Sequence, residues 1–311
     1  MDFARSRRMQ KSYALTIRSE AMRTRTSFVA VFLLLLFTAA AECQINYGSN
    51  TLVGKYANVN DIKVYYEIYG AGEPLLLLHG NSGSIQSFMY QIPELSKHFR
   101  VIAVDSRAQG KSTDSDQEIT YALMASDMSA LIEKLNLGSV DVVGWSDGGN
   151  VGLELALAHP QQVKKLVTFG ANYTHENSLA PPDPVAMEAD DPRLLTTTRA
   201  IKKLREGRVE RSPVVKKKLA DLMEKYPNLT VEQLKRIKAP VLVVVGDRDL
   251  IKVDQTISLF TSLPHSQLFI VPGASHLVPI EQPELVNSEA IKFLSTPFRD
   301  LDGYYFTNLP N

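Results

Sequence analysis

The chain has 311 residues, of which 44% are hydrophobic and 22% charged, the composition of a soluble globular protein. Its 34 basic and 34 acidic residues balance, so the net charge gives no indication of a nucleic-acid partner. The length accommodates one large α/β domain with an insertion, or two small domains.

Residues 1–43 differ from the rest of the chain. Seven basic residues among the first 25 precede an apolar run from Phe28 to Phe37, and small residues follow it. This order predicts a secretory signal peptide, because the run is too short for a transmembrane helix. We therefore expect an exported protein, periplasmic or secreted, with no membrane span in the mature chain. An uncleaved signal anchor or a buried helix are the alternatives, and translation starts at Met1 or at Met22.

The end of this leader also bears on lipidation and charge. Cys43 is the only cysteine, so the chain forms no internal disulfide. Ala40 and Glu42 precede it where a lipoprotein signal has leucine and a small residue, so lipid anchoring at Cys43 is less expected. Residues 44–311 contain 27 basic and 31 acidic residues, a net charge near −4 that implies no anionic polymer as partner.

Short apolar runs alternate with helical patterns over most of the chain. We expect strands at 53–58, 62–69, 74–78, 101–104, 140–143, 163–169, 241–245 and 267–271. Helical patterns cover about 84–98, 121–135, 147–159 and 283–294. Strands that are apolar throughout are buried on both faces, so the pattern predicts a doubly wound, mostly parallel sheet.

The alternation stops between residues 172 and 236. Apolar residues at helical spacing near Leu219 and Leu222 predict a small helical cap insertion, with the core at 44–171 and 237–296 and a tail at 297–311. The basic run from Arg193 to Lys218 contains interspersed acidic residues, so we interpret it as a solvated helix face.

The most informative stretch is residues 140–152, a short apolar strand followed by a helix of small residues. Gly144, Ser146 and Gly148 form the pattern G-x-S-x-G at their junction. A serine on so tight a turn needs neighbours without side chains, and the turn presents its hydroxyl beyond the sheet. Ser146 is therefore the candidate nucleophile; the alternative is an ordinary strand–helix joint.

A serine nucleophile needs an imidazole base and a carboxylate that orients it. Two loops after downstream strands supply these groups: Asp247 and Asp249 follow one strand, and His276 follows the next. His276 is the candidate base. Asp254 is a remote third choice for the acid. The other histidines, at positions 79, 98, 159, 175 and 265, are expected to be structural or solvated.

Four motifs, at 79–81, 144–149, 246–249 and 273–276, together resemble the α/β-hydrolase superfamily over about residues 54–295. The nearest branch resembles the single-domain esterases, lactonases and biphenyl hydrolase-like (valacyclovir hydrolase-like) enzymes. This resemblance implies an α/β-hydrolase fold and no cofactor or metal. It favours Asp249 as the acid over Asp247, and it places the oxyanion-hole N–H groups at Asn81 and Asp147, with His79 shaping the first of these loops.

The expected function is that of a serine hydrolase that cleaves a small ester, lactone or similar acyl substrate through an acyl-enzyme on Ser146. The side chains of Trp145, Asn81 and Asp147 are candidate substrate contacts. Asp147 favours a substrate with an amine, unless its carboxylate only stabilises the helix N-terminus. The alternatives are C–C bond hydrolysis or perhydrolysis on the same triad, or a ligand-binding protein without turnover. We expect a monomer or a homodimer.

One loop departs from the family pattern. Ala108 follows Arg107 where the family has glycine, so the turn is expected to need no positive φ at this residue.

Overall fold

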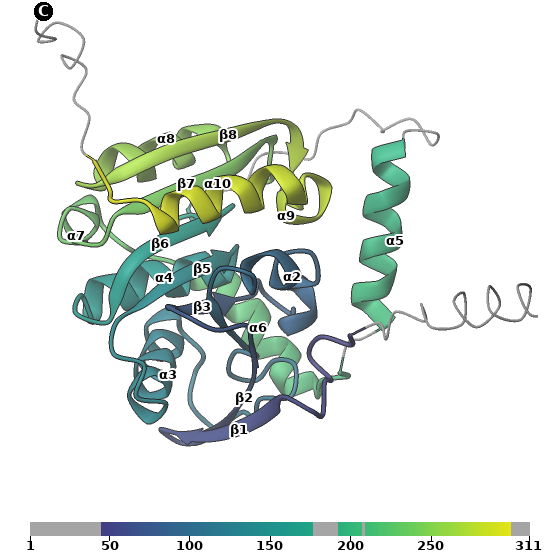
Figure 1. Cartoon of the computed structure of the whole chain (residues 1–311). Helices are drawn as coiled ribbons and strands as arrows, with labels where there is room; N and C mark the ends of the chain where they lie inside the picture. Colours follow the sequence, from purple (N-terminus) through teal and green to yellow (C-terminus); the bar gives the residue numbers. More distant parts are fainter. Residues whose placement is uncertain (1–44, 177–191, 207–208, 300–311) are drawn as a thin grey trace, which may run out of the picture. The chain divides into compact units, whose positions relative to one another are not determined.

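A computed structural model of the chain describes residues 45–176, 192–206 and 209–299 (Figure 1). All the elements below belong to one compact unit within residues 46–311. The predicted signal peptide, the Cys43 site and the end of the C-terminal tail lie outside the described residues. In the described part of the chain, no helix has both the length and the apolar character to cross a bilayer.

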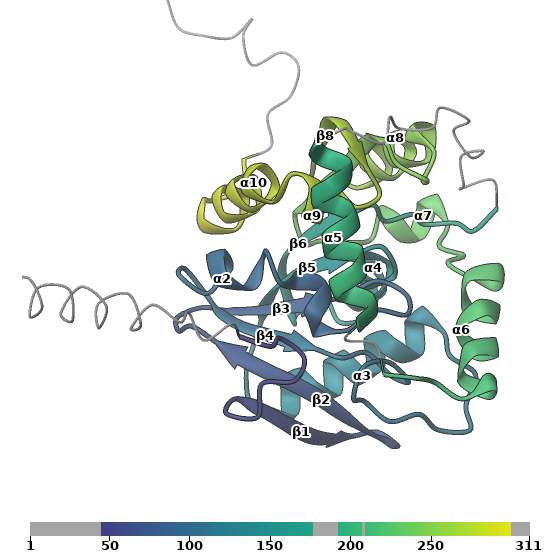
Figure 2. The ribbon, with the colours of Figure 1, turned by 90° about the vertical axis from the view of Figure 1, so that its right-hand side faces the viewer.

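Eight strands form one mixed sheet, in the order β1-β2-β4-β3-β5-β6-β7-β8. Strands β3 to β8 are mutually parallel, whereas β1 and β2 form an antiparallel hairpin that pairs with β4 (Figure 2). The strand bounds are β1 Gly54–Val59, β2 Ile62–Tyr69, β3 Pro74–Leu78, β4 Arg100–Val104, β5 Val140–Trp145, β6 Val163–Phe169, β7 Val241–Arg248 and β8 Ser266–Ser275.

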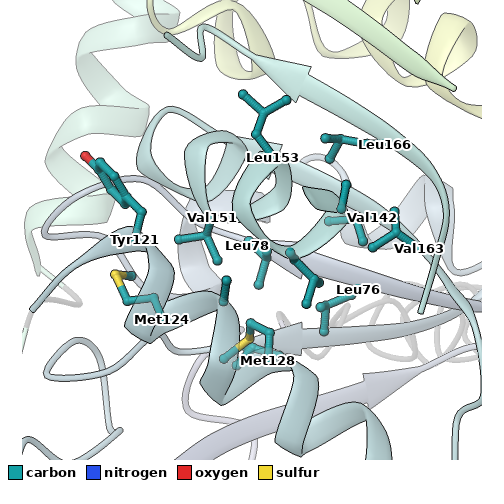
Figure 3. Packing of buried hydrophobic residues seen from close by; sticks show 14 of the residues in the cluster. Leu76, Leu78, Tyr121, Met124, Met128, Val142, Val151, Leu153, Val163 and Leu166 are labelled. Carbon is teal, nitrogen blue, oxygen red and sulfur yellow. The ribbon is translucent and has the colours of Figure 1, made fainter. Parts of the chain in front are cut away.

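Alternate strand residues point into two hydrophobic cores, one on each side of the sheet. Leu76, Leu78 and Val142 face α3 (Tyr121–Lys134) and α4 (Asp147–Ala158), as Figure 3 shows. Leu75, Leu77 and Val143 face the other side, with the 3-10 turn η1 (Ile85–Phe88), α2 (Ile92–Leu95), α9 (Val278–Glu281) and α10 (Pro283–Ser295). Helices on both faces confirm the predicted doubly wound fold.

The described residues between β6 and β7, in the stretch predicted as the cap, form three helices. They are α5 (Pro192–Glu206), α6 (Pro213–Lys225) and α7 (Val231–Leu234). Leu219 and Leu222 of α6 pack into the core on the α3 side. The division of the chain into core and cap stays a prediction, because residues 46–311 form one compact unit.

Three helical elements differ from the sequence pattern: the helix expected over 84–98, and α8 (Val253–Ser262) and the short α9, for which no helix was expected. The expected helix over 84–98 is divided into η1 and α2, with Pro93 in the first turn of α2. Helix α8 was not predicted, because it buries few residues and its apolar Val253 and Ile257 are exposed.

The prediction for Ala108 is wrong: its φ is +61°, in the left-handed region. The surrounding turn imposes this conformation. The Ala108 N–H donates to Thr113 O at 3.0 Å, and the preceding Arg107 is anchored in the interior by Asp127. Left-handed backbone costs a non-glycine residue about 1–2 kcal/mol, so these neighbours must offset that cost.

Candidate active site

Ser146 lies on the turn between β5 and α4, with φ 55° and ψ −120°. Few non-glycine residues adopt this conformation, and it persists only where the surroundings enforce it. Here the Ser146 N–H donates to Phe169 O at 2.7 Å, and Ser146 O accepts from Gly149 and Asn150 at the start of α4. The predicted strand–turn–helix is therefore present, and its strain falls on the candidate nucleophile.

Close backbone approach explains the glycines around Ser146. A Cβ at Gly144 would overlap Gly148 O, and a Cβ at Gly148 would overlap Leu78 O at the end of β3. A Cβ at Gly80 would lie 3.1 Å from Ser146 Cβ. These contacts bring the loop after β3 against the serine turn.

His276 and Asp249 form the next part of the site. The His276 Nδ1 lies 2.8 Å from Asp249 Oδ1, and the Asp249 side chain is fully buried, whereas that of His276 is 16% exposed. Asp249 Oδ1 also accepts from the Ile251 N–H at 2.8 Å. The pair thus has the geometry of an oriented imidazole, with Nε2 left to act as a base.

The alternative acids are placed differently. Asp247 is exposed and its Oδ1 accepts from the Gly273 N–H at 2.7 Å, so it braces the loop that carries His276. Asp254 is exposed on α8 and accepts from the Gln255 N–H. The contact with His276 therefore favours Asp249 as the acid.

Two residues that sequence reasoning did not select, Gly170 and Glu281, support this pair. A Cβ at Gly170, after β6, would lie 2.7 Å from His276 Nδ1 and 2.9 Å from Asp249 Oδ2. Glu281 accepts from the N–H and the hydroxyl of Ser275, at 2.7 and 2.8 Å. Only Gly170 carries a sequence signal, a glycine directly after a buried strand.

Two backbone N–H groups near Ser146 are available to a ligand. Within the described residues, neither the Asn81 N–H nor the Asp147 N–H donates a hydrogen bond. Buried N–H groups are seldom left without an acceptor, and a pair of them beside a nucleophile suits a developing oxyanion. The predicted assignment of the oxyanion hole fits this geometry.

His79 anchors the loop that carries Asn81. Its Nε2 accepts from the Ser106 N–H at 3.1 Å, so the proton is on Nδ1, which lies 2.8 Å from Gly80 O. Burial lowers the pKa of His79 to about 4, and the nearby Arg211 charge acts in the same direction. A neutral His79 therefore supports the loop, in the structural role expected for it.

The other histidines make local contacts. His159 Nδ1 lies 3.2 Å from Ser129 Oγ, and His175 Nδ1 lies 2.7 Å from Asn228 Oδ1. The rings of His98 and His265 pack against Phe99 and Phe298. These contacts agree with structural or surface roles.

The proposed substrate contacts have partners within the protein. The Asn81 amide donates to Leu219 O of α6 at 3.2 Å, so this side chain is not free as the sequence suggested. Trp145 is buried, and its Nε1 donates to His276 O at 2.9 Å. Substrate contact by either side chain stays a prediction.

The Asp147 carboxylate is buried next to the site. Burial raises its pKa above the ordinary range, whereas Tyr121, Asn81 and His276 oppose this shift. Its Oδ2 has no hydrogen-bond partner among the described residues. Hydrogen bonds from Tyr121 and Asn81 to this carboxyl group favour its ionised form, and a cationic group placed beside Oδ2 would favour that form further.

No group of three or more His, Cys, Asp or Glu side chains in the described ranges is arranged to hold a metal ion.

The mostly parallel sheet, the strained serine turn and the Asp249–His276 pair define a hydrolase of the α/β type. A family profile described as alpha/beta hydrolase fold matches residues 73–208. The RutD protein of a Caulobacter species, named provisionally as a carbamate hydrolase, is 30% identical over 269 residues, which cover 75% of this chain and 96% of that protein. The chain belongs to the α/β-hydrolase superfamily.

Solved structures agree with this assignment. A thermophilic esterase from Thermogutta terrifontis is 25% identical, with a TM-score of 0.65, over 78% of this chain and 98% of that one. A meta-cleavage product hydrolase from Pseudomonas fluorescens is 20% identical, with a TM-score of 0.66 over the same shares, and shows the fold alone.

Proposed function

We propose that the protein is a serine hydrolase that cleaves a small carboxylic ester, lactone or similar acyl substrate. The observation that carries this proposal is the 2.8 Å contact between His276 Nδ1 and buried Asp249, in a site that also contains the strained Ser146 turn. The names of the relatives support the class of reaction: the Thermogutta neighbour is an esterase, and an enol-lactonase from Burkholderia xenovorans shares the fold.

The reaction has two stages. Ser146 Oγ attacks the substrate carbonyl while His276 Nε2 accepts its proton, and the Asn81 and Asp147 N–H groups bind the developing oxyanion. The bond between the carbonyl carbon and the leaving group then breaks, and His276 donates the proton to the leaving group. In the second stage water attacks the acyl-enzyme while His276 accepts its proton, and His276 then returns this proton to Ser146 Oγ as the acid is released.

A fluorophosphonate probe tests the nucleophile, because it bonds covalently to activated serines. We expect the purified protein to be labelled on the peptide that contains Ser146, and the Ser146→Ala variant to be unlabelled. Hydrolysis of p-nitrophenyl acetate should disappear in the same variant. A folded parent that neither reacts with the probe nor turns over the ester would refute the proposal and favour a ligand-binding protein.

We also propose that Asp147 selects substrates with an amine near the scissile carbonyl. A bound ammonium group would supply the missing partner of Oδ2 and stabilise the buried carboxylate. We expect the ratio of kcat/KM for an alanine ester over the matched propionate ester to fall about tenfold in Asp147→Asn, the loss of one charge-assisted contact. Equal kcat/KM for the two esters in the parent would contradict this proposal.

A further inference from the structure

The segment that connects α5 to α6 reaches the loop of the proposed oxyanion hole. Arg211, in this segment, donates from Nη2 to Gly83 O at 3.2 Å and from Nε to Ala108 O at 3.3 Å. Gly83 lies two residues after Asn81, whereas Ala108 belongs to the loop after β4. One guanidinium group thus bridges two loops of the core from within the segment between β6 and β7.

The two bridged loops are already bonded to each other. The Ser82 N–H donates to Gln109 Oε1 at 2.6 Å, and Asp105 accepts from the Ile85 N–H at 2.8 Å. The left-handed backbone of Ala108, which the sequence did not predict, belongs to the same turn that presents its carbonyl to Arg211. The loops and Arg211 therefore form one hydrogen-bonded unit around Asn81.

A second contact from the same segment holds Asn81 itself. The Asn81 Nδ2 donates to Leu219 O of α6, and the Asn81 Oδ1 accepts from Ser82 Oγ at 2.9 Å. The side chain of Asn81 thus anchors the loop to α6, while its backbone N–H has no acceptor in the part of the chain that the structure describes. The direction of that N–H depends on how residues 211–219 lie on the loop.

We infer that Arg211 is a positioning residue, which aligns the Asn81 N–H with the oxyanion by fixing residues 81–83 against residues 108–109. This inference rests on the proposed function, since it assigns a role in the same reaction. An oxyanion donor acts in the transition state and little in the ground state, so loss of Arg211 should lower kcat and leave KM nearly unchanged. Removing such a donor costs about 100- to 1,000-fold in kcat, so misaligning it should cost about 10- to 100-fold.

Three variants separate this role from general effects. Arg211→Ala removes the bridge, and Arg211→Lys retains the charge but not the planar fork that binds two carbonyls. Lys216→Met is the matched control, because Lys216 is exposed and lines the same cavity of about 340 Å³, together with Ser82, Val209, Glu210 and Arg211. This cavity leaves room for a guanidinium ion to enter Arg211→Ala.

With p-nitrophenyl acetate we expect kcat to fall at least tenfold in Arg211→Ala, with KM within about twofold. Arg211→Lys should lie between parent and Arg211→Ala, and Lys216→Met should match the parent. Millimolar guanidinium should restore part of kcat in Arg211→Ala alone. An unchanged kcat in Arg211→Ala would overturn the inference. A rise in KM with kcat unchanged would also overturn it, because Arg211 would then be a substrate contact.

Hydrogen exchange keeps this test separate from the proposed function. Amides of residues 79–88 should exchange faster in Arg211→Ala than in the parent and in Lys216→Met, whether or not the protein turns over an ester. A parent without turnover refutes the proposed hydrolase, and faster exchange would then still show that Arg211 holds the loop. Unchanged exchange in Arg211→Ala overturns the inference by itself.

Discussion

At the scale of single residues, Gly170 shows how tightly the Asp249–His276 pair is enclosed. Its φ is +61°, and any side chain would press on His276 Nδ1 and Asp249 Oδ2. Gly138 has the similar φ of +70°, but a Cβ there would meet nothing within 4 Å. A side chain at either position would strain the backbone in the same way. Only a side chain at position 170 would also contact His276 and Asp249.

We expect Gly170→Ala to lower kcat about 100-fold or more, because a displacement of about 1 Å in a positioned group has effects of that size. Gly138→Ala should lose about 1 kcal/mol of stability and no activity. Steady-state kinetics compare kcat of the two variants, and urea denaturation compares their free energies of unfolding. Equal activity of the two variants would contradict the assignment of Asp249 and His276.

His79 makes the structure sensitive to acid. Its pKa is about 4 in the folded protein, mainly through burial, against an ordinary 6.5. The unfolded chain therefore takes up a proton at a higher pH than the folded one, so the stabilisation is complete above pH 6.5 and is lost as the pH falls through 4. The loss amounts to roughly 3 kcal/mol between pH 7 and pH 4.

Buried carboxyl groups such as Asp105 and Asp141, whose pKa is raised to about 7 and about 6, act in the opposite direction. The loss should therefore be measured by urea denaturation, as the change with pH in the difference between the unfolding free energies of the parent and His79→Gln. In parallel, histidine ring resonances followed by NMR should include one that does not titrate above pH 5. A His79 resonance with a midpoint near 6.5 would contradict the neutral assignment.

At the scale of elements, Arg107 joins three parts of the chain. Its guanidinium donates from Nε and Nη2 to Asp127 of α3, both at 2.7 Å, and from Nη2 to Asp61 of the β1–β2 turn at 2.8 Å. Arg107 and Asp127 are both fully buried, whereas the Asp61 side chain is 35% exposed.

Removing the Asp127 charge leaves the buried Arg107 guanidinium paired with the partly exposed Asp61 and without its buried partner. We therefore expect Asp127→Asn to lower the free energy of unfolding by about 3–5 kcal/mol. Asp61→Asn should cost much less than Asp127→Asn, because solvent reaches the Asp61 carboxylate. Urea denaturation measures the free energy of unfolding of both variants. Equal decreases would show that burial does not distinguish Asp127 from Asp61.

The same scale shows what the sequence could predict. The strands and the three loops that carry Ser146, Asp249 and His276 follow from apolar runs and from the residues at their ends. Contacts between separate elements left no such signal: nothing in the pattern indicates that Asn81 bonds to Leu219, or that Glu281 accepts from Ser275. The left-handed Ala108 was missed for the same reason, since its conformation comes from Thr113 and from the anchored Arg107.

At the scale of the whole molecule, the start of the described chain is tied to the sheet. Buried Glu67 of β2 accepts from the Gly48 and Asn50 N–H groups, both at 2.8 Å, and from the hydroxyls of Tyr65 and Tyr69. All of these partners lie after residue 45. The folded unit therefore does not depend on residues 1–43 for these bonds.

We propose that residues 1–43 are a cleaved export signal. The protein recovered from the exported fraction should then begin near Gln44, as N-terminal sequencing will show. A chain expressed without residues 1–43, so that it begins at residue 44, should unfold at the same urea concentration as the protein recovered from the exported fraction. A chain that starts at residue 54 should lose about 2 kcal/mol or more, because Glu67 loses two charge-assisted donors. Recovery of the intact leader on exported protein would contradict cleavage.

The chain contains a single tryptophan, and its indole N–H is bonded to the main chain of His276. Its fluorescence therefore reports on one place in the molecule without any added dye. When a ligand displaces the turn that follows β8, the emission maximum should shift and the quantum yield should change. The protein thus contains its own optical probe of the loop that carries the proposed base.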